Sequence, residues 1–181
     1  MQESNYSKSA ASFKAPPREG FGEAIWKILE QVTDPEVPVL TITDLGIVRD
    51  VRPLPTSPER GGEPGYEIVI TPTYTGCPAM DMIAMNIKMA LIENGYSNIK
   101  ITTVLAPAWT TDWMTEDGKR KLKEYGVAAP DKKFDIPTDG VECPLCNSTN
   151  TKLISEFGST ACKALYQCND CKEPFDFFKC H

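Results

Sequence analysis

The sequence predicts an α/β (α+β) fold: a small helix-strand-strand-helix-strand-helix domain followed by a C-terminal zinc ribbon. Helical and strand patterns alternate over residues 20–126, and two C-x-x-C pairs lie within residues 142–181. One core usually occupies about 100 to 150 residues, so a chain of 181 residues is expected to hold two unequal units. Residues 1–19 are small and polar and predict a disordered arm, and the polar residues 127–141, with two prolines, predict a linker.

The elements are predicted from hydrophobic periodicity and from Gly and Pro punctuation. Apolar residues recur at helical spacing from Gly22 until Pro35 stops the pattern, and an apolar face after Pro78 ends at Gly95. Runs of β-branched residues that alternate with polar ones predict the strands. The expected elements are a helix at 22–32, strands at 47–51 and 66–73, a helix at 78–94, a strand at 99–105, a helix at 112–125 and ribbon strands at 153–157, 164–167 and 175–179.

Four cysteines form two C-x-x-C pairs with 21 residues between them, slightly more than the usual spacing of about 15 to 20. They are Cys143, Cys146, Cys168 and Cys171. Two turns that each offer two thiolates to one tetrahedral ion predict one structural zinc per chain. A unit of about 40 residues needs such a staple to fold. Iron in the same cage would make a rubredoxin-like electron carrier, and spacing alone leaves both metals open.

Three further residues have no place in the four-thiolate set: Cys162, Cys180 and His181. One interpretation is that Cys162 packs as a small core residue and that Cys180 is a tethered chain end. The other is that one of the three replaces a ribbon ligand or helps to bind a transient second metal. The sequence leaves both open.

Cys77 stands between a β-branched run and a helical pattern, and it is the only cysteine before Cys143. Pro78 suits the first helical position, which places Cys77 at the N-cap, where the helix dipole stabilises a thiolate. Its pKa is therefore expected to lie below the ~8.5 of a free thiol. The alternative is a buried thiol that merely packs. The only histidine is His181, so a Cys-His enzyme is not expected, and no Gly-rich phosphate-binding motif marks a nucleotide site.

The net charge of −6 and the pI of about 4.9 exclude a broad positive field, so nucleic acid and membranes are not expected partners. No apolar run approaches the roughly 18 residues of a membrane span, and a cytoplasmic location is expected. Thiols stay reduced there, which favours metal binding over disulfides. A basic cluster in GKRKLKEYG, residues 118–126, is either a solvated helix face or a docking site for an acidic protein.

Three separated blocks carry a family resemblance: DPEVPVLTITDLG at 34–46, TYTGCP at 73–78 and PAWTTDWMTE at 107–116. In this order they resemble the motifs of the metal-sulfur cluster assembly domain of SufT-like proteins, over nearly all of residues 22–126. The tail adds FGSTACK at 157–163 and CNDCKEPF at 168–175. With this tail the whole chain resembles the PaaD family, which is encoded with the bacterial phenylacetyl-CoA 1,2-epoxidase system.

The resemblance implies an accessory role in iron-sulfur cluster assembly or repair for that oxygenase, at its ferredoxin-type reductase, without turnover of phenylacetyl-CoA. It implies protein partners, namely oxygenase and reductase components and the iron-sulfur assembly machinery. Thr75 and Ala108 depart from prolines that are common in the family, but neither change removes a ligand. The positions that the resemblance marks for contact with transient iron or an iron-sulfur cluster are Asp34, Glu36, Asp44, Thr73 and Cys77.

The residues and the resemblance together favour a non-catalytic maturation factor in which Cys77 contacts iron or a cluster and the ribbon docks the client. One alternative is an electron-transfer subunit with iron in the ribbon. The other is a purely structural subunit of the oxygenase, in which Phe175, Phe177 and Phe178 would anchor an interface instead of packing in the ribbon core.

Overall fold

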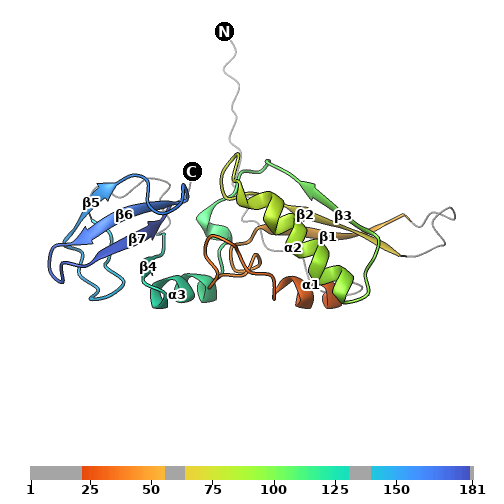
Figure 1. Ribbon diagram of the computed structural model, residues 1–181, viewed down its shortest axis with the longest axis horizontal. Coiled ribbons are helices and arrows are strands. Elements are labelled where there is room, and N and C mark those ends of the chain that lie inside the picture. Colours follow the sequence, from red (N-terminus) through yellow and green to blue (C-terminus); the bar gives the residue numbers. More distant parts are fainter. Residues whose placement is uncertain (1–21, 56–63, 131–139, 180–181) are drawn as a thin grey trace, which may run out of the picture.

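The structure, a computed structural model, describes residues 22–55, 64–130 and 140–179 and shows two units side by side (Figure 1). The expected arm lies outside the described residues. The N-terminal unit contains α1 (Glu23–Leu29), β1 (Val48–Leu54), β2 (Gly65–Ile70), α2 (Ala79–Glu93), β3 (Ile99–Thr103), the 3-10 turn η2 (Thr111–Trp113) and α3 (Glu116–Glu124). The predicted element order and the mixed α+β class are confirmed.

The first sheet has the strand order β1-β2-β3. β1 and β2 form an antiparallel hairpin, whereas β3 lies parallel to β2. A parallel neighbour requires a crossover connection, and α2 supplies it by running across one face of the sheet (Figure 1). The carboxyl end of β2 therefore leads directly into the turn that carries Cys77.

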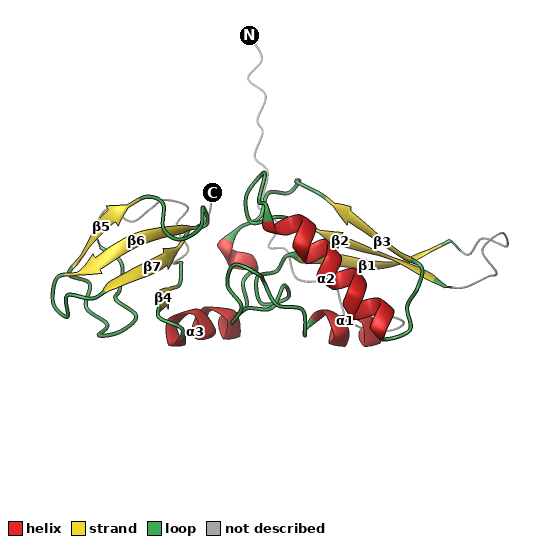
Figure 2. Ribbon diagram, in the orientation of Figure 1, coloured by secondary structure: helices red, strands yellow, loops and turns green. Residues whose placement is uncertain are grey.

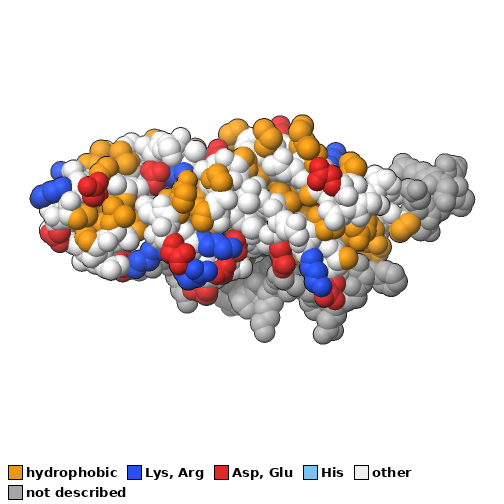
Figure 3. Space-filling model, turned by 60° about the horizontal axis from the view of Figure 1, so that its bottom comes forward, with side chains coloured by type: hydrophobic (Ala, Val, Ile, Leu, Met, Phe, Trp, Pro, Cys, Tyr) orange, Lys and Arg blue, Asp and Glu red, His pale blue; other side chains and the backbone are white. Residues whose placement is uncertain are grey.

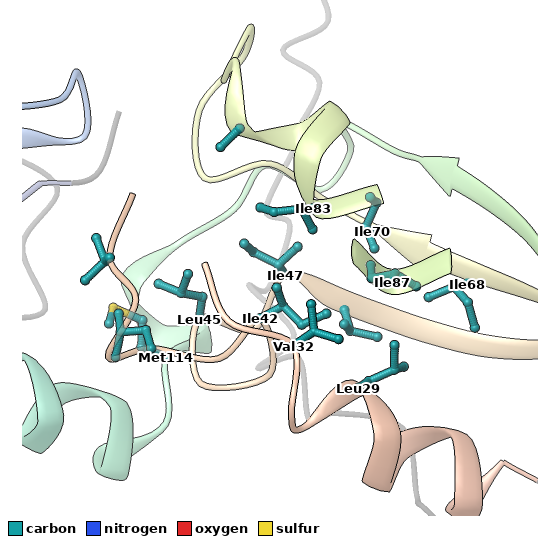
Figure 4. Packing of buried hydrophobic residues seen from close by; sticks show 14 of the residues in the cluster. Leu29, Val32, Ile42, Leu45, Ile47, Ile68, Ile70, Ile83, Ile87 and Met114 are labelled. Atoms are coloured by element: carbon teal, nitrogen blue, oxygen red, sulfur yellow. The ribbon is translucent and has the colours of Figure 1, made fainter. Parts of the chain in front are cut away.

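The core lies between this sheet face and the two helices α1 and α2. Ile68 and Ile70 of β2 face Ile83 and Ile87 of α2, and Leu29 of α1 closes the cluster (Figure 4). All five side chains are at most 1% exposed. The strands alternate apolar and polar residues with period 2, and the helices repeat apolar residues with period 3.6. The apolar face of the sheet therefore packs against the apolar faces of the helices.

The chain after β3 departs from the single helix predicted at 112–125. It forms η2 and then α3, because the Thr115 side chain accepts the Gly118 N–H at 2.9 Å and so caps a new helix start. α1 is also shorter than predicted and ends at Leu29. The chain then passes through a series of turns, residues 34–46, before β1 begins.

Asp44 ties those turns to α3. Its carboxylate accepts the Thr41 N–H at 3.0 Å and the Thr115 hydroxyl at 3.1 Å, and it pairs with the Lys121 ammonium at 2.8 Å. Gly46 follows at φ +66°, and a Cβ there would lie 2.5 Å from the Trp113 carbonyl oxygen. A side chain at this position would therefore push the turn away from η2.

The ribbon unit contains β5 (Thr151–Ser155), β6 (Lys163–Cys168) and β7 (Pro174–Phe178), and its described part has no helix (Figure 2). A fourth strand, β4 (Val127–Ala128), completes the order β4-β7-β6-β5. β4 pairs in parallel with β7, so these two residues belong to the ribbon sheet and not to the linker predicted at 127–141. A strand of two residues has no periodicity that the sequence could reveal.

Two ribbon residues enter the core of the N-terminal unit. Trp109 donates its indole N–H to the Leu45 carbonyl at 2.7 Å, and its ring meets Phe178 of β7 edge-on at 6.3 Å. Phe178 and Cys162, both from the ribbon, are buried in the core cluster of the N-terminal unit. Phe175 and Phe177 instead pack with Tyr166 in the ribbon's own core, which supports core packing for these two rings.

Asp44→Asn should destabilise the protein by roughly 1–2 kcal/mol at neutral pH, because it removes the charge that Lys121 and Thr115 contact inside the protein. Burial alone would raise the pKa of Asp44, but the Lys121 ammonium and the Thr41 groups outweigh burial and lower it from 3.8. The stabilisation is therefore complete above the unfolded-state pKa and is lost as the pH falls through the folded-state pKa. Urea unfolding at several pH values should show the difference between wild type and variant shrink below about pH 4; a constant difference would contradict this role.

Candidate functional site

The four cysteines of the C-x-x-C pairs form one cluster, with all four sulfurs within 4.8 Å of one another. The Cys143 and Cys171 sulfurs are 3.8 Å apart, and those of Cys146 and Cys168 are 3.6 Å apart. Sulfurs at ~2.3 Å from a tetrahedral ion would stand about 3.8 Å apart, so the donor set fits a single metal ion. Zinc and iron share this donor set, so the geometry supports metal binding without naming the metal.

Each half of the cluster is built by the same turn. The residue four places after the first cysteine of each pair donates its N–H to that cysteine's carbonyl, at 2.9 Å for Asn147 and 3.1 Å for Lys172. Both residues have positive φ, 59° and 70°. This conformation, unusual outside glycine, bends each loop back toward its strand so that both thiols face the same point.

A second thiol site lies between the two units. Cys77 and Cys162 line one small cavity of about 10 Å³, room for about one water-sized body. The remaining lining residues come from the turns at 34–47, the β2–α2 connection, α2 and the end of β7: Asp34, Glu36, Val37, Leu45, Ile47, Thr73, Met80, Ile83 and Phe178. Four of the five positions marked by the family resemblance therefore meet here, together with a cysteine from the other unit.

Cys77 does not have the acidity that the sequence predicted. α2 begins at Ala79, so Pro78 occupies the N-cap position and Cys77 precedes it. Burial raises the pKa of the Cys77 thiol; hydrogen bonds from the Ala79 N–H and the Tyr74 hydroxyl oppose this rise, and the charges of Glu36 and Asp34 add to it. The net direction is upward, so the thiol is protonated near neutral pH.

Asp34 and Glu36 reach the cavity from one tight turn. Asp34 Oδ1 accepts the N–H groups of Glu36 and Val37, each at 2.8 Å, which fixes the turn that presents the Glu36 side chain. Asp34 is 7% exposed, and burial raises the pKa of its carboxyl group against these two hydrogen bonds. The Asp34 carboxylate thus caps the turn, and the Glu36 carboxylate of the same turn points toward the ribbon.

Cys162 lies directly before β6 and is 4% exposed. Its sulfur is 3.4 Å from Glu36 Oε2 and 3.0 Å from the Thr160 hydroxyl. Burial raises the pKa of Cys162 to about 11. Its carbonyl accepts the Lys179 N–H at 2.9 Å, so the ends of β6 and β7 hold it in place. Its packing in the core agrees with the first interpretation of this residue, and its contact with Glu36 adds a property that the sequence did not reveal.

Of the remaining predicted residues, one lies away from the cavity and two are not described by the structure. Asp44 is absent from the cavity lining, and its carboxylate is occupied by Thr41, Thr115 and Lys121. Cys180 and His181 lie outside the described residues. The cavity therefore gathers Asp34, Glu36, Thr73 and Cys77, and of the three auxiliary residues only Cys162 can be placed in it.

The basic cluster of α3 is matched by acidic side chains. Figure 3 shows Lys and Arg interleaved with Asp and Glu on the face that carries this helix. The ion pairs are Lys119–Glu116, Arg120–Asp117, Arg120–Glu124, Lys121–Asp44, Lys121–Asp117 and Lys123–Glu142. This arrangement is typical of a solvated helix face and offers an acidic partner little unpaired positive charge. Among the described residues, no helix has the length and apolar character needed to cross a membrane.

Two family models match the chain, one for each unit. Residues 22–95 match the iron-sulfur cluster assembly protein family, and residues 128–179 match the PaaD zinc beta ribbon domain. The second match begins within β4, in agreement with the placement of that strand in the ribbon sheet.

Comparison with known proteins gives one curated relative and several solved structures. A putative 1,2-phenylacetyl-CoA epoxidase subunit of Escherichia coli is 50% identical over 169 residues, which cover 92% of this chain and 95% of the relative. A domain of unknown function (DUF59) from Bacillus anthracis is 28% identical, with 55% of this chain and 89% of that chain covered and a TM-score of 0.48. A Mycobacterium tuberculosis protein described as associated with Fe-S complex assembly and repair is 28% identical, with 61% and 93% covered and a TM-score of 0.36. On the extent and identity of the Escherichia coli match, with a family model matching each unit, the chain belongs to the PaaD family of phenylacetyl-CoA epoxidase subunits.

Proposed function

We propose that this protein is a non-catalytic accessory protein of phenylacetate catabolism that assists iron-sulfur cluster assembly or repair in the phenylacetyl-CoA epoxidase, at its ferredoxin-type reductase. The observation that carries the proposal is the cavity in which Cys77 lies beside Asp34, Glu36 and Thr73. The match of residues 22–95 to the iron-sulfur cluster assembly family and the name of the Escherichia coli relative support it.

The cavity is a poor site for an organic substrate. Its volume of about 10 Å³ admits one water-sized body, whereas pockets for organic ligands usually measure about 300–1,000 Å³. Cys77 also lacks the features of a catalytic nucleophile, because its pKa is raised and no histidine occurs among the described residues. These properties favour Cys77 as a ligand for a metal ion over Cys77 as a nucleophile that attacks a carbonyl group.

The donor set suits ferrous iron as cargo. Thiol sulfur is a soft ligand and carboxylate oxygen a hard one, and iron accepts both. The carboxylates of Asp34 and Glu36 attract a cation to the cavity mouth, and Cys77 then exchanges its proton for the metal. A thiol that stays protonated until a metal arrives fits a transient carrier better than a permanent metal centre.

We further propose that the ribbon holds one structural zinc per chain. A site closed by four thiolates leaves no open coordination position, which suits folding more than chemistry. The ribbon's own core cluster is small and packs around Tyr166, Phe175 and Phe177. The metal therefore supplies much of the folding free energy of this unit. Iron in the same cage would favour the electron-carrier alternative.

Metal analysis of the purified chain should give one zinc per chain, lost in Cys143→Ser together with the ordered strands of the ribbon. The reason is that three thiolates bind zinc less tightly and leave one coordination position open to water. Zinc content and amide exchange in β6 and β7 would report both effects. Cys77→Ser is the control, because Cys77 lies outside the cluster and the variant should keep its zinc. Iron in place of zinc, with visible thiolate-to-iron absorption, would contradict the structural assignment.

Cys77→Ser should lower the iron and acid-labile sulfide content of the epoxidase reductase when the two proteins are produced together, toward the level found without this protein. Glu36→Gln should act in the same direction, because it removes a carboxylate from the cavity. Asp44→Asn is the matched control, since it neutralises a carboxylate of the same turns outside the cavity while also lowering stability. Reductase clusters that stay fully occupied with Cys77→Ser would rule out the proposed role.

A further inference from the structure

We propose that the outward face of α2 is a self-association surface, on which two copies of this chain pair as a reversible dimer with their α2 helices antiparallel. The surface, here called the α2 stripe, consists of Met82, Met85, Met89 and Ile92. None of these four residues lines the Cys77 cavity. The inference therefore goes beyond the proposed function and stands or falls without it.

The α2 stripe is apolar but lies in solvent. Its four side chains are between 51% and 57% exposed. The opposite face of the same helix is buried against the sheet through Ile83, Ile87 and Leu91. In Figure 1, α2 lies in front of the sheet, and no other described helix or strand covers its outward side. Because a helix that is apolar on both faces is normally buried on both, the outward face has the composition of a contact surface.

The spacing of the α2 stripe favours a second helix as its occupant. The steps along the stripe are three, four and three residues, which is the spacing of the a and d positions of a heptad. These positions form the narrow seam along which one helix packs against another. Three of the four residues are methionines, whose flexible and polarisable side chains adapt to an irregular apolar partner.

The charges beside the stripe favour a second copy of this chain. Asp81 and Lys88 both take the g position of the heptad, so they lie on the same flank, about 10 Å apart along the helix axis. Both are exposed, and within the described part of the chain neither forms an ion pair. A partner helix with charges of one sign would be attracted by one of these groups and repelled by the other. A second copy supplies both signs.

The antiparallel direction satisfies both charges. In this arrangement like flanks of the two helices meet, so Asp81 of each copy lies opposite Lys88 of the other, which forms two equivalent pairs. The same register brings Met85 of both copies to the centre. Met82 of each copy then lies beside Met89 of the other. The apolar seam and the charged flank are thus matched by a single register.

A parallel pair would be less favourable. It would bring Lys88 opposite Glu93 but would leave Asp81 opposite the uncharged Asn86. It would also place like ends of the helix dipoles together, whereas the antiparallel pair places the positive end of each α2 beside the negative end of the other. Because interfaces below about 1,200 Å² are usually weak and a pair of 15-residue helices is small, the dimer should dissociate on dilution.

Sedimentation equilibrium of the full, zinc-loaded chain over a range of concentrations tests the inference. Wild type should show a reversible monomer–dimer equilibrium. Met85→Glu should weaken dimerisation at least about tenfold, because it brings two carboxylates together at the centre of an apolar seam. Ile154→Glu, at an apolar residue of β5 that is 51% exposed, is the matched control and should dimerise as wild type does.

Exchange of the flanking charges tests the direction of the helices. Lys88→Asp makes all four groups of the flank acidic and should weaken dimerisation roughly fivefold to tenfold. The double variant Asp81→Lys with Lys88→Asp restores opposite charges in the antiparallel register and should recover most of the lost affinity. Circular dichroism checks that each variant is folded.

Four results would overturn the inference. They are a wild type that stays monomeric at every concentration, a dimer that Met85→Glu leaves unchanged, a double variant that stays as weak as Lys88→Asp, and a monomeric chain that binds the reductase through the α2 stripe. The last result would assign the stripe to another protein. None of the four changes the proposed role of Cys77, which is tested by the cluster content of the reductase.

Discussion

The buried hydrogen bond from Trp109 to the Leu45 carbonyl is the contact on which the rest of the arrangement depends. An indole N–H that is removed from water needs a hydrogen-bond acceptor, and here the turns that precede β1 supply that acceptor. The Trp109 ring also makes an edge-on contact with Phe178, the last residue of β7. One side chain therefore joins the loop after β3, the turns at 34–46 and the ribbon. The cavity lies beside this junction, where those turns, the β2–α2 connection with the start of α2, and the ribbon come together.

Burial outweighs the helix dipole at this junction. The start of α2 would favour a thiolate at Cys77, and the Ala79 N–H does donate to its sulfur, but desolvation and two neighbouring carboxylates raise the pKa. The same reasoning holds for Cys162, where burial raises the pKa to about 11. Two neutral thiols beside carboxylates resist oxidation and alkylation, because the thiolate is the reactive form.

The sequence predicted the order of elements and the four-cysteine cage, because both are encoded by short-range patterns: hydrophobic periodicity and two C-x-x-C pairs. It did not predict β4, whose two residues acquire their strand character only by pairing with β7. It also grouped Asp44 with Asp34 and Glu36. An Asp that caps turns and an Asp that lines a cavity have the same sequence signature, a carboxylate in a polar loop, and only the contacts with Lys121 and Thr115 separate them. That Cys162 and Cys77 line one cavity depends on how the two units pack, which no local pattern records.

β6 connects the four-cysteine cluster of the ribbon with the cavity. It begins at Lys163, directly after Cys162, and ends at Cys168, a member of the four-thiolate cage. A strand of this length spans roughly 17–20 Å, so the cage orders one end of a rigid element whose other end presents Cys162 to Glu36. Order at the four-cysteine cluster can therefore position a cavity residue at the other end of the strand. This strand thus joins the two units that the two family models match.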